Sequence, residues 1–280
     1  MAKKSGLKRQ LKKLWASQKA LAIPVTYLML FFSLLIVISL TYSLAVAKIG
    51  AQSSALKASV AKQNMLTLDD AVHSVAWSFG ASKIVYMDDC GGFFQTQSTE
   101  KHLAINFTDG QSFFDIVFNS SVGKAAYELE PSESLFASTF IKGDDRSIAN
   151  ESDSTMTQLY VAVGDDAQEL TLCYRPSATV AVIGTSNGKP LNLIRIYIIS
   201  LNSSQNLSLK EGFYLKVTAL NVTVTAYQYE FNESLSHLTL KVTLDEIQSI
   251  VKLPISSNSQ GAIVNLEIVL CNVRLQKTEV

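Results

Sequence analysis

Residues 20–47 read ALAIPVTYLMLFFSLLIVISLTYSLAVA and carry no charged side chain. A helix needs about 20 apolar residues to cross the hydrocarbon core of a bilayer, and this run is longer. The residues before it are rich in Lys and Arg, whereas the first acidic residue of the chain is Asp69. Because basic residues mark the cytoplasmic end of a membrane helix, we expect residues 1–19 to be a basic cytoplasmic leader and the chain after Lys48 to lie outside.

A cleaved secretory signal peptide is the alternative interpretation of this run. Ala45-Val46-Ala47 forms a small-residue motif that such a cleavage would use. The apolar part of a signal peptide is, however, only about 7–15 residues long. Because the run is longer and helical character continues past Lys48, we expect residues 20–47 to be a retained transmembrane helix in contact with the lipid bilayer.

The residues after the apolar run continue a helical pattern. Over residues 48–80 the apolar side chains recur at the spacing of one helix face. The last members of this stripe, which we expect to pack against the following strands, are Leu68, Val72, Val75 and Phe79. The charged side chains that we expect in water are Lys57, Lys62 and Asp69. Thr67-Leu-Asp-Asp70 resembles a capping box, so residues 21–79 form either one very long helix or two helices in line with a restart there, and Gly80 is placed as the C-terminal cap.

After residue 80 the sequence changes to short runs rich in β-branched and aromatic residues, separated by turns. The first series of predicted strands is 83–87, 102–107, 113–118, 125–129, 159–163, 170–174 and 179–183. The second series is 193–201, 213–219, 222–231, 238–244 and 263–275. Thr243-Leu-Asp-Glu246 predicts a short helix near 244–251.

These patterns together predict an α+β fold. A long N-terminal helix, first transmembrane and then amphipathic, precedes an antiparallel β-sandwich ectodomain with many short strands. Residues 81–187 would form a first β unit and residues 188–280 a second. One large β domain is the alternative, since a chain of this length allows either arrangement.

Net charge and cysteine content limit the classes of partner and of fold. The formal net charge is zero and the pI is near 6.8, so we expect no nucleic-acid partner. The three cysteines allow at most one internal disulfide, or three buried thiols without a bond. Cys90 lies in a polar turn that could adapt to disulfide geometry, and Cys173 lies in the same β series. We therefore expect Cys90–Cys173 as the bridge if one forms.

N-glycosylation sequons are concentrated in the β-rich part of the chain. The seven acceptor residues are Asn106, Asn119, Asn150, Asn202, Asn206, Asn221 and Asn232. Their absence from the leader and from the apolar run predicts a glycosylated outer surface. A Ser/Thr-rich composition that produces sequons without modification is the alternative. Asn221 falls on the polar face of an alternating strand, where a glycan would be tolerated.

The sequence offers little for catalysis or cofactor binding. The three histidines, His73, His102 and His237, are far apart in the sequence, and no Cys or His spacing typical of a metal site occurs. We expect no catalytic residues, no metal, no cofactor and no enzyme activity. An acidic loop with Asp144, Asp145, Glu151 and Asp153 could supply calcium ligands, but solvated turn residues are the better interpretation.

One strand carries three aromatic side chains on the same face. They are Tyr227, Tyr229 and Phe231, which alternate with other residues along the run 222–231. Such a row could form an exposed binding platform. Packing within the sheet is the interpretation that we prefer.

The order of these segments resembles archaeal type IV pilin-like cell-surface proteins. That family has a leader of the class III signal peptide type, which a dedicated peptidase cuts after a small residue preceded by Lys or Arg. Lys19-Ala20 precedes Leu21 in this way, and Pro24 matches the proline that archaeal pilins often carry early in the helix. Ala76–Val85, followed by Gly91-Gly92, resembles the helix-to-sheet junction of these proteins. Val25, in contrast, stands where bacterial pilins carry a glutamate.

The resemblance implies a membrane-anchored protein with its N-terminus in the cytoplasm and its C-terminal domain outside the cell. Its role would be structural or adhesive, with homo-oligomers or a surface filament formed through the N-terminal helix. Components of the surface layer or other extracellular ligands would be its partners. The alternative is a single-pass binding or sensory ectodomain that does not polymerise, with a hydrolase as a more remote third.

Overall fold

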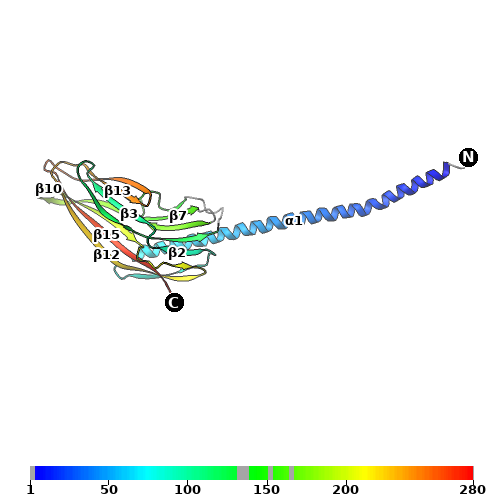
Figure 1. Cartoon of the computed structure of the whole chain (residues 1–280), viewed down its shortest axis with the longest axis horizontal. Coiled ribbons are helices and arrows are strands. Elements are labelled where there is room, and N and C mark those ends of the chain that lie inside the picture. Colours follow the sequence, from blue (N-terminus) through cyan, green and yellow to red (C-terminus); the bar gives the residue numbers. More distant parts are fainter. Residues whose placement is uncertain (1–3, 131–138, 151–153, 164–166, 280) are drawn as a thin grey trace. The chain divides into compact units, whose positions relative to one another are not determined.

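The computed structural model describes residues 4–130, 139–150, 154–163 and 167–279, with side chains from residue 24 onward except that of Val163. One helix, α1 (Lys4–Val75), precedes all of the described strands. The chain divides into two compact units, one up to Ser53 and one from Ser54 onward. Figure 1 shows α1 in blue to cyan and the strands that follow it.

The part of α1 in the first unit exposes all of its described side chains. Every residue from Pro24 to Ser53 is exposed, and most of those before Lys48 are apolar. The hydroxyl groups of Ser33 and Thr41 donate to carbonyls of the preceding turn, so these polar groups are paired inside the helix. By length and composition this segment could cross a membrane.

The described strands of the second unit form three sheets. Sheet A has the order β1 (Ser82–Met87), β12 (Phe213–Phe231), β15 (Ala262–Thr278), β10 (Lys189–Ser200), β9 (Ser177–Ser186). Sheet B has the order β11 (Ser208–Leu209), β2 (Phe93–Gln97), β5 (Lys124–Leu129), β8 (Gln168–Tyr174), β7 (Thr157–Val163), β6 (Phe140–Lys142). Sheet C has the order β14 (Ile247–Pro254), β13 (His237–Leu244), β3 (His102–Thr108), β4 (Phe114–Ser121).

The division into β units at residue 188 is not the one observed. Strands from before and after this residue share all three sheets, and the whole segment from Ser54 onward is one compact unit. Pairing is antiparallel as expected except between β10 and β15, which run parallel. This exception follows from the connection, since β10 and β15 are separated by four other strands rather than by a tight hairpin.

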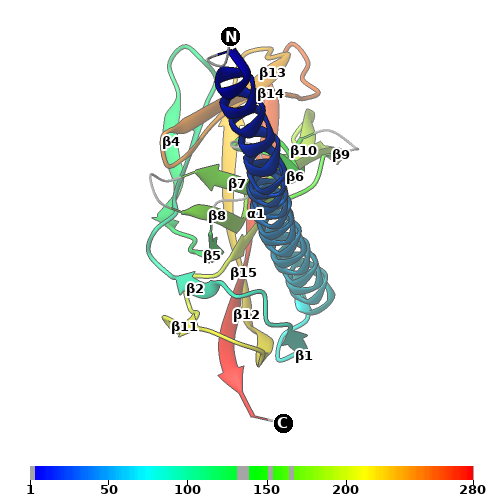
Figure 2. The same ribbon diagram turned by 90° about the vertical axis from the view of Figure 1, so that its right-hand side faces the viewer.

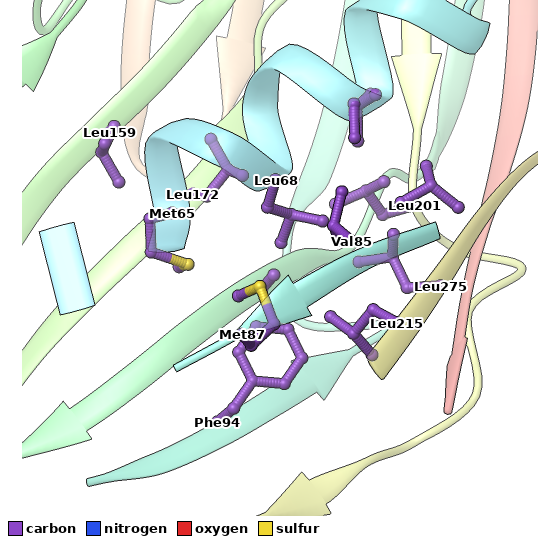
Figure 3. Close-up of a cluster of buried hydrophobic side chains, with 14 of the residues drawn as sticks. Met65, Leu68, Val85, Met87, Phe94, Leu159, Leu172, Leu201, Leu215 and Leu275 are labelled. Carbon is purple, nitrogen blue, oxygen red and sulfur yellow. The ribbon is translucent and has the colours of Figure 1, made fainter. Parts of the chain in front are cut away.

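Two buried clusters form the core, and the long strands β12 and β15 contribute to both (Figure 2). The first cluster joins the second part of α1 to sheet B and to one end of sheet A. In Figure 3, Met65 and Leu68 of α1 lie over Val85, Met87 and Phe94 from the strands. The second cluster lies between sheet C and the other end of sheet A. The helix is therefore part of the core of the β-rich unit.

The predicted helical stripe is confirmed at three of its four last positions. Leu68, Val72 and Val75 are buried in the first cluster, whereas Phe79 is 79% exposed. The helix ends at Val75, and Trp77 adopts a positive φ of 69°, so the chain leaves the helical path before Phe79. Of the charged residues expected in water, Lys62 is exposed and Lys57 is half-buried, but Asp69 is fully buried.

Of the two alternatives for the N-terminal helix, the single long helix is observed, whereas the Gly80 cap and the short helix near 244–251 are wrong. The Thr67 hydroxyl donates to the carbonyl of Gln63, so α1 continues through this position without a restart. Gly80 lies beyond the helix, and its N–H donates to Ala219 of β12. Residues 244–251 form the turn and second strand of the β13–β14 hairpin, because Asp245 adopts the positive φ that a tight turn needs.

Most predicted strands are confirmed with shifted ends. The runs 213–219 and 222–231 are a single strand, β12, with a register shift between Ala219 and Asn221. This local irregularity interrupts the alternation of apolar residues, and for that reason the sequence pattern suggests two strands. Strands β2, β6, β11 and β14 were not predicted; two of them are only two or three residues long.

Candidate functional site

Asp69 is the central residue of a buried polar cluster between α1 and sheet B. Its carboxylate accepts hydrogen bonds from the hydroxyl of Thr157 at 2.8 Å and from that of Tyr174 at 3.0 Å. The ammonium of Lys142 lies 2.5 Å from the other carboxylate oxygen. A buried carboxylate is stable only with such partners, so these three contacts explain how a charge is accommodated in this core.

Three neighbouring strands supply these donors. Thr157 and Tyr174 are register partners on β7 and β8, and Lys142 ends β6, which pairs with β7. Burial, followed by the charge of Asp69, raises the pKa of Tyr174 well above its usual value. The phenol therefore remains a donor, and the cluster links α1 to the three strands of sheet B.

His73 extends the cluster to the surface. It follows Asp69 by one helical turn, and its Nε2 lies 2.8 Å from the Thr157 hydroxyl and 3.4 Å from Asp69. Because Thr157 donates its proton to Asp69, we assign the ring proton to Nε2 of His73. The ring also contacts Tyr174 edge-on at 5.7 Å between centroids. The side chains of this cluster bind one another, so the cluster has a structural role in holding α1 on sheet B.

A second polar cluster surrounds the fully buried guanidinium of Arg175. It donates to the carboxylate of Asp144 and to the carbonyls of Arg146 and Thr155. The Arg146 side chain also binds Asp144, at 2.9 Å between Nη2 and Oδ2. Hydrogen bonds from Arg146, then from Arg175, hold the pKa of Asp144 well below its usual value. Both oxygens of the Asp144 carboxylate are therefore paired with arginine side chains.

Glycine is required in the turn that precedes this cluster. Gly143 has a φ of 82°, and a Cβ there would lie 2.1 Å from the carbonyl oxygen of Thr157. Only glycine accepts both conditions without strain. The turn therefore places Asp144 beside β7, where Gln158 donates to the carbonyls of Asp144 and Arg146.

The calcium ligands considered from the sequence are not brought together in the described residues. Asp144 binds the two arginines, and Asp145 is exposed. Glu151 and Asp153 lie outside the described residues. The histidines are also dispersed: His73 lies on α1, His102 begins β3 and His237 begins β13. Among the described residues, no group of three or more metal-ligating side chains occurs.

A cleft of about 290 Å³ lies between sheets B and C. Its lining includes Lys101, Phe140, Gln158, Tyr160, Leu244 and Ile247. Lys101 is paired with Asp245, and Gln158 is hydrogen-bonded to backbone carbonyls, so these two polar groups have internal partners. The cleft is close to the smallest size typical of small-molecule sites. Its walls contain no pairing of a nucleophile with a base among these residues.

The predicted glycan acceptors are accessible. Asn119, Asn150, Asn206, Asn221 and Asn232 are exposed, and Asn106 and Asn202 are half-buried. Asn221 accepts a hydrogen bond from Asn272 on the neighbouring strand, which confirms that it lies on a polar surface. Accessibility is a condition for modification; the five exposed side chains meet it fully, and those of Asn106 and Asn202 meet it in part.

The predicted disulfide between Cys90 and Cys173 is not formed. Cys90, Cys173 and Cys271 are free and buried, as in the alternative of three buried thiols. Along β8, Leu172 and Tyr174 face the first core cluster, to which Cys90 also belongs. Alternation along the strand therefore directs Cys173 to the other face, where its thiol contacts Gln158. Burial raises the pKa of Cys173 to about 11.

The aromatic row of β12 packs within the protein. Tyr227, Tyr229 and Phe231 are half-buried against the second core cluster. The Tyr229 hydroxyl donates to Asp115 at 2.7 Å, and Tyr227 stacks on Tyr229. The preferred interpretation, packing in the sheet, is thus confirmed over an exposed platform.

The predicted leader-processing residues lie on α1, but only their backbone is described. Lys19, Ala20 and Leu21 are in the continuous helix that also includes Pro24. The Asp69 cluster was not predicted from the sequence, because its partners are 73 to 105 residues away in the chain.

No family model, curated protein or solved structure matches this chain.

Proposed function

We propose that this chain is a membrane-anchored, pilin-like structural or adhesive protein of an archaeal cell surface. One observation carries the proposal: α1 exposes an apolar surface on all sides before Lys48 and is part of a β-rich core after Ala58. The exposed half suits a lipid bilayer or the helical core of a filament. The buried half makes the same helix inseparable from the domain that it carries.

Assembly would follow from this division of the helix. In a filament, the apolar halves of neighbouring subunits would exchange lipid contacts for contacts with one another. The β-rich units, arranged as a sandwich with glycans on their outer faces, would then form the outer surface. The junction around Asp69 would transmit load from helix to strands, since it connects α1 to β6, β7 and β8.

Leader removal after Ala20 would prepare the subunit for assembly. Cleavage there makes Leu21 the first residue and places Pro24 in the first helical turn. The backbone N–H groups of a first turn have no intrahelical partners, so proline costs little there. In the uncut chain the same proline lies inside α1.

A non-polymerising, single-pass binding or sensory protein is the second candidate. Two observations favour it: Val25 stands where bacterial pilins use a glutamate, and a cleft of about 290 Å³ lies between sheets B and C. In this case the leader would be retained, and α1 would remain a permanent anchor.

The mature N-terminus distinguishes the two candidates. We expect mass spectrometry of protein from native cells to find Leu21 as the first residue, and electron microscopy to find surface fibres. Ala20→Phe should block cleavage because the peptidase needs a small residue there, whereas Ala16→Phe, a matched change within the leader, should be processed normally. A retained leader on cells without fibres would replace the pilin proposal by the anchored binding protein.

A further inference from the structure

The outer face of sheet C exposes several large apolar side chains. The alternating residues Leu103, Ile105 and Phe107 of β3 are buried in the second core cluster, so the residues between them face outward. On the same outward face, the two edge strands expose large side chains. They are Phe114 at 61%, Ile116 at 55% and Ile250 at 62%.

Two of the seven sequons lie on this face. Asn106 of β3 has Ile116 of β4 as its register partner on one side and Lys241 of β13 on the other. Lys241 in turn pairs with Ile250 of β14. Asn119 pairs with Ala104, which also faces outward. Asn106 is thus inside the row that contains the apolar side chains.

Cross-strand geometry sets the distances on this face. Directly opposed residues have Cβ atoms about 4.5–5.5 Å apart, and diagonal neighbours are about 7–8 Å apart. Ile116 is directly opposite Asn106, and Phe114, which pairs with Thr108, is a diagonal neighbour. A sugar attached to Asn106 would therefore start beside both apolar side chains.

The surface chemistry of a sugar matches this arrangement. The C–H groups on one side of a pyranose ring can cover Ile116 and Phe114, while the hydroxyl groups at its edge stay hydrated. Lys241 and Thr108 border the row and offer polar contacts. Without a cover, β4 and β14 present apolar side chains at the two edges of sheet C, which favours association between copies.

We propose that N-linked glycans on Asn106 and Asn119 cover the outer apolar face of sheet C and prevent copies of this chain from associating through it. The proposal rests on the proposed function, because it requires the β-rich unit to be on the outer side of the membrane. It assigns a structural role to two sequons, whereas Asn221 lies beside the polar Asn272 and needs no such role.

The first test is glycopeptide mass spectrometry of the full chain from native cells. We expect sugar on both Asn106 and Asn119. If other sequons are modified but these two are bare, the covering proposal is overturned while the external location stands. If all seven are bare, this proposal fails, whereas the leader and the fibres still test the proposed function independently.

The second test removes the two glycans from the intact protein in detergent. Asn106→Gln with Asn119→Gln should raise self-association, measured by light scattering, and apolar-dye fluorescence several-fold. The matched control, Asn150→Gln with Asn206→Gln, removes two acceptors outside sheet C and should leave both readouts unchanged. Enzymatic removal of the glycans from folded parent protein should reproduce the increase, which separates it from a folding defect.

Rescue completes the experiment. Phe114→Thr and Ile116→Thr, added to the glycan-free sheet C variant, should return dye fluorescence and self-association to the level of the parent. Equal behaviour of the sheet C variant, its control and the parent would overturn the proposal. The proposal is also overturned if the rescued variant still associates, since another surface would then be responsible for the association.

Discussion

The two parts of α1 belong to one continuous helix but have opposite surroundings. From Pro24 to Ser53 every side chain is exposed, although most are apolar before Lys48. From Ser54 to Val75 a narrow stripe is buried in the first core cluster, and it includes a fully buried carboxylate. In water an exposed apolar surface is unfavourable, and a buried carboxylate is unfavourable unless it is paired.

This difference shows that the exposure of a side chain is favourable or unfavourable only relative to its surroundings, which can be water, lipid or the protein core. An apolar helix with free sides is stable in lipid, where its backbone groups are paired internally. A buried Asp69 is stable in a β-rich core because Lys142, Thr157 and Tyr174 satisfy it. The first part of the helix depends on an environment outside the protein, and the second part depends on contacts within it.

The largest expected effect comes from breaking the Asp69 cluster. Asp69→Ala leaves the ammonium of Lys142 and two buried hydroxyl groups without their acceptor. Each buried donor that loses its acceptor costs about 1–3 kcal/mol, and the Lys142 side chain is 35% exposed and adds little, so we expect the two buried hydroxyls to lower the free energy of unfolding by about 3–5 kcal/mol. Asp70→Ala, at the exposed neighbouring position, should change it by less than about 0.5 kcal/mol.

Chemical unfolding of the full chain in detergent measures this effect. The chain has two tryptophans, so a Trp15→Phe background leaves Trp77, which contacts Tyr197 on β10, as the fluorescent probe. Equal stability of the Asp69 and Asp70 variants would mean that the cluster contributes nothing to holding α1 on sheet B.

The same substitution in each half of the helix gives the sharpest comparison. Leu68→Ala removes a fully buried side chain from the first core cluster and should cost about 2–5 kcal/mol of unfolding free energy. Leu35→Ala changes an exposed side chain in the apolar half and should leave the unfolding of the β-rich unit unchanged. Both are measured in the same Trp15→Phe background. Similar losses for the two would show that the halves are not energetically separate.

Regular patterns were enough to predict much of the fold. Runs of β-branched and aromatic residues located most strands, and the apolar spacing of Leu68, Val72 and Val75 identified the buried face of α1. Because these patterns repeat over several residues, each residue of a run strengthens the prediction made from the others. The pattern failed at Phe79 because the positive φ of Trp77 ends the helical path, and such a conformation is rare for a bulky residue.

Contacts between distant residues could not be predicted from the sequence. Asp69 looks like a solvated capping residue until strands β6, β7 and β8 bring its donors to it. The register within sheet C likewise decides that Asn106 lies beside Ile116, although both residues were visible in the sequence. Local spacing determines which face a residue is on, and tertiary pairing determines its neighbours.

The smallest expected effect is a pH dependence of stability around Asp144. The pKa of this carboxyl is lowered in the folded protein, first by hydrogen bonds from Arg146 and then by those from Arg175. A group with a lowered folded pKa contributes stability that is present above its unfolded pKa, about 3.9, and is lost as the pH falls through the folded pKa. Acidification below about pH 4 should therefore weaken the protein through this residue.

The size of this effect is limited by solvent. The Asp144 side chain is 37% exposed, so screening reduces its contribution to about 1 kcal/mol. Unfolding measured between pH 7 and pH 3 should show a steeper loss below pH 4 in the parent than in Asp144→Asn, which keeps an acceptor oxygen but cannot ionise. The slopes are compared rather than the absolute stabilities, because the variant also leaves Arg175 buried without its counter-charge. If the unfolding free energies of the parent and of Asp144→Asn fall with pH at the same slope, the acid sensitivity comes from other carboxylates. The charge of Asp144 would then contribute nothing to stability, in contrast to the charge of Asp69.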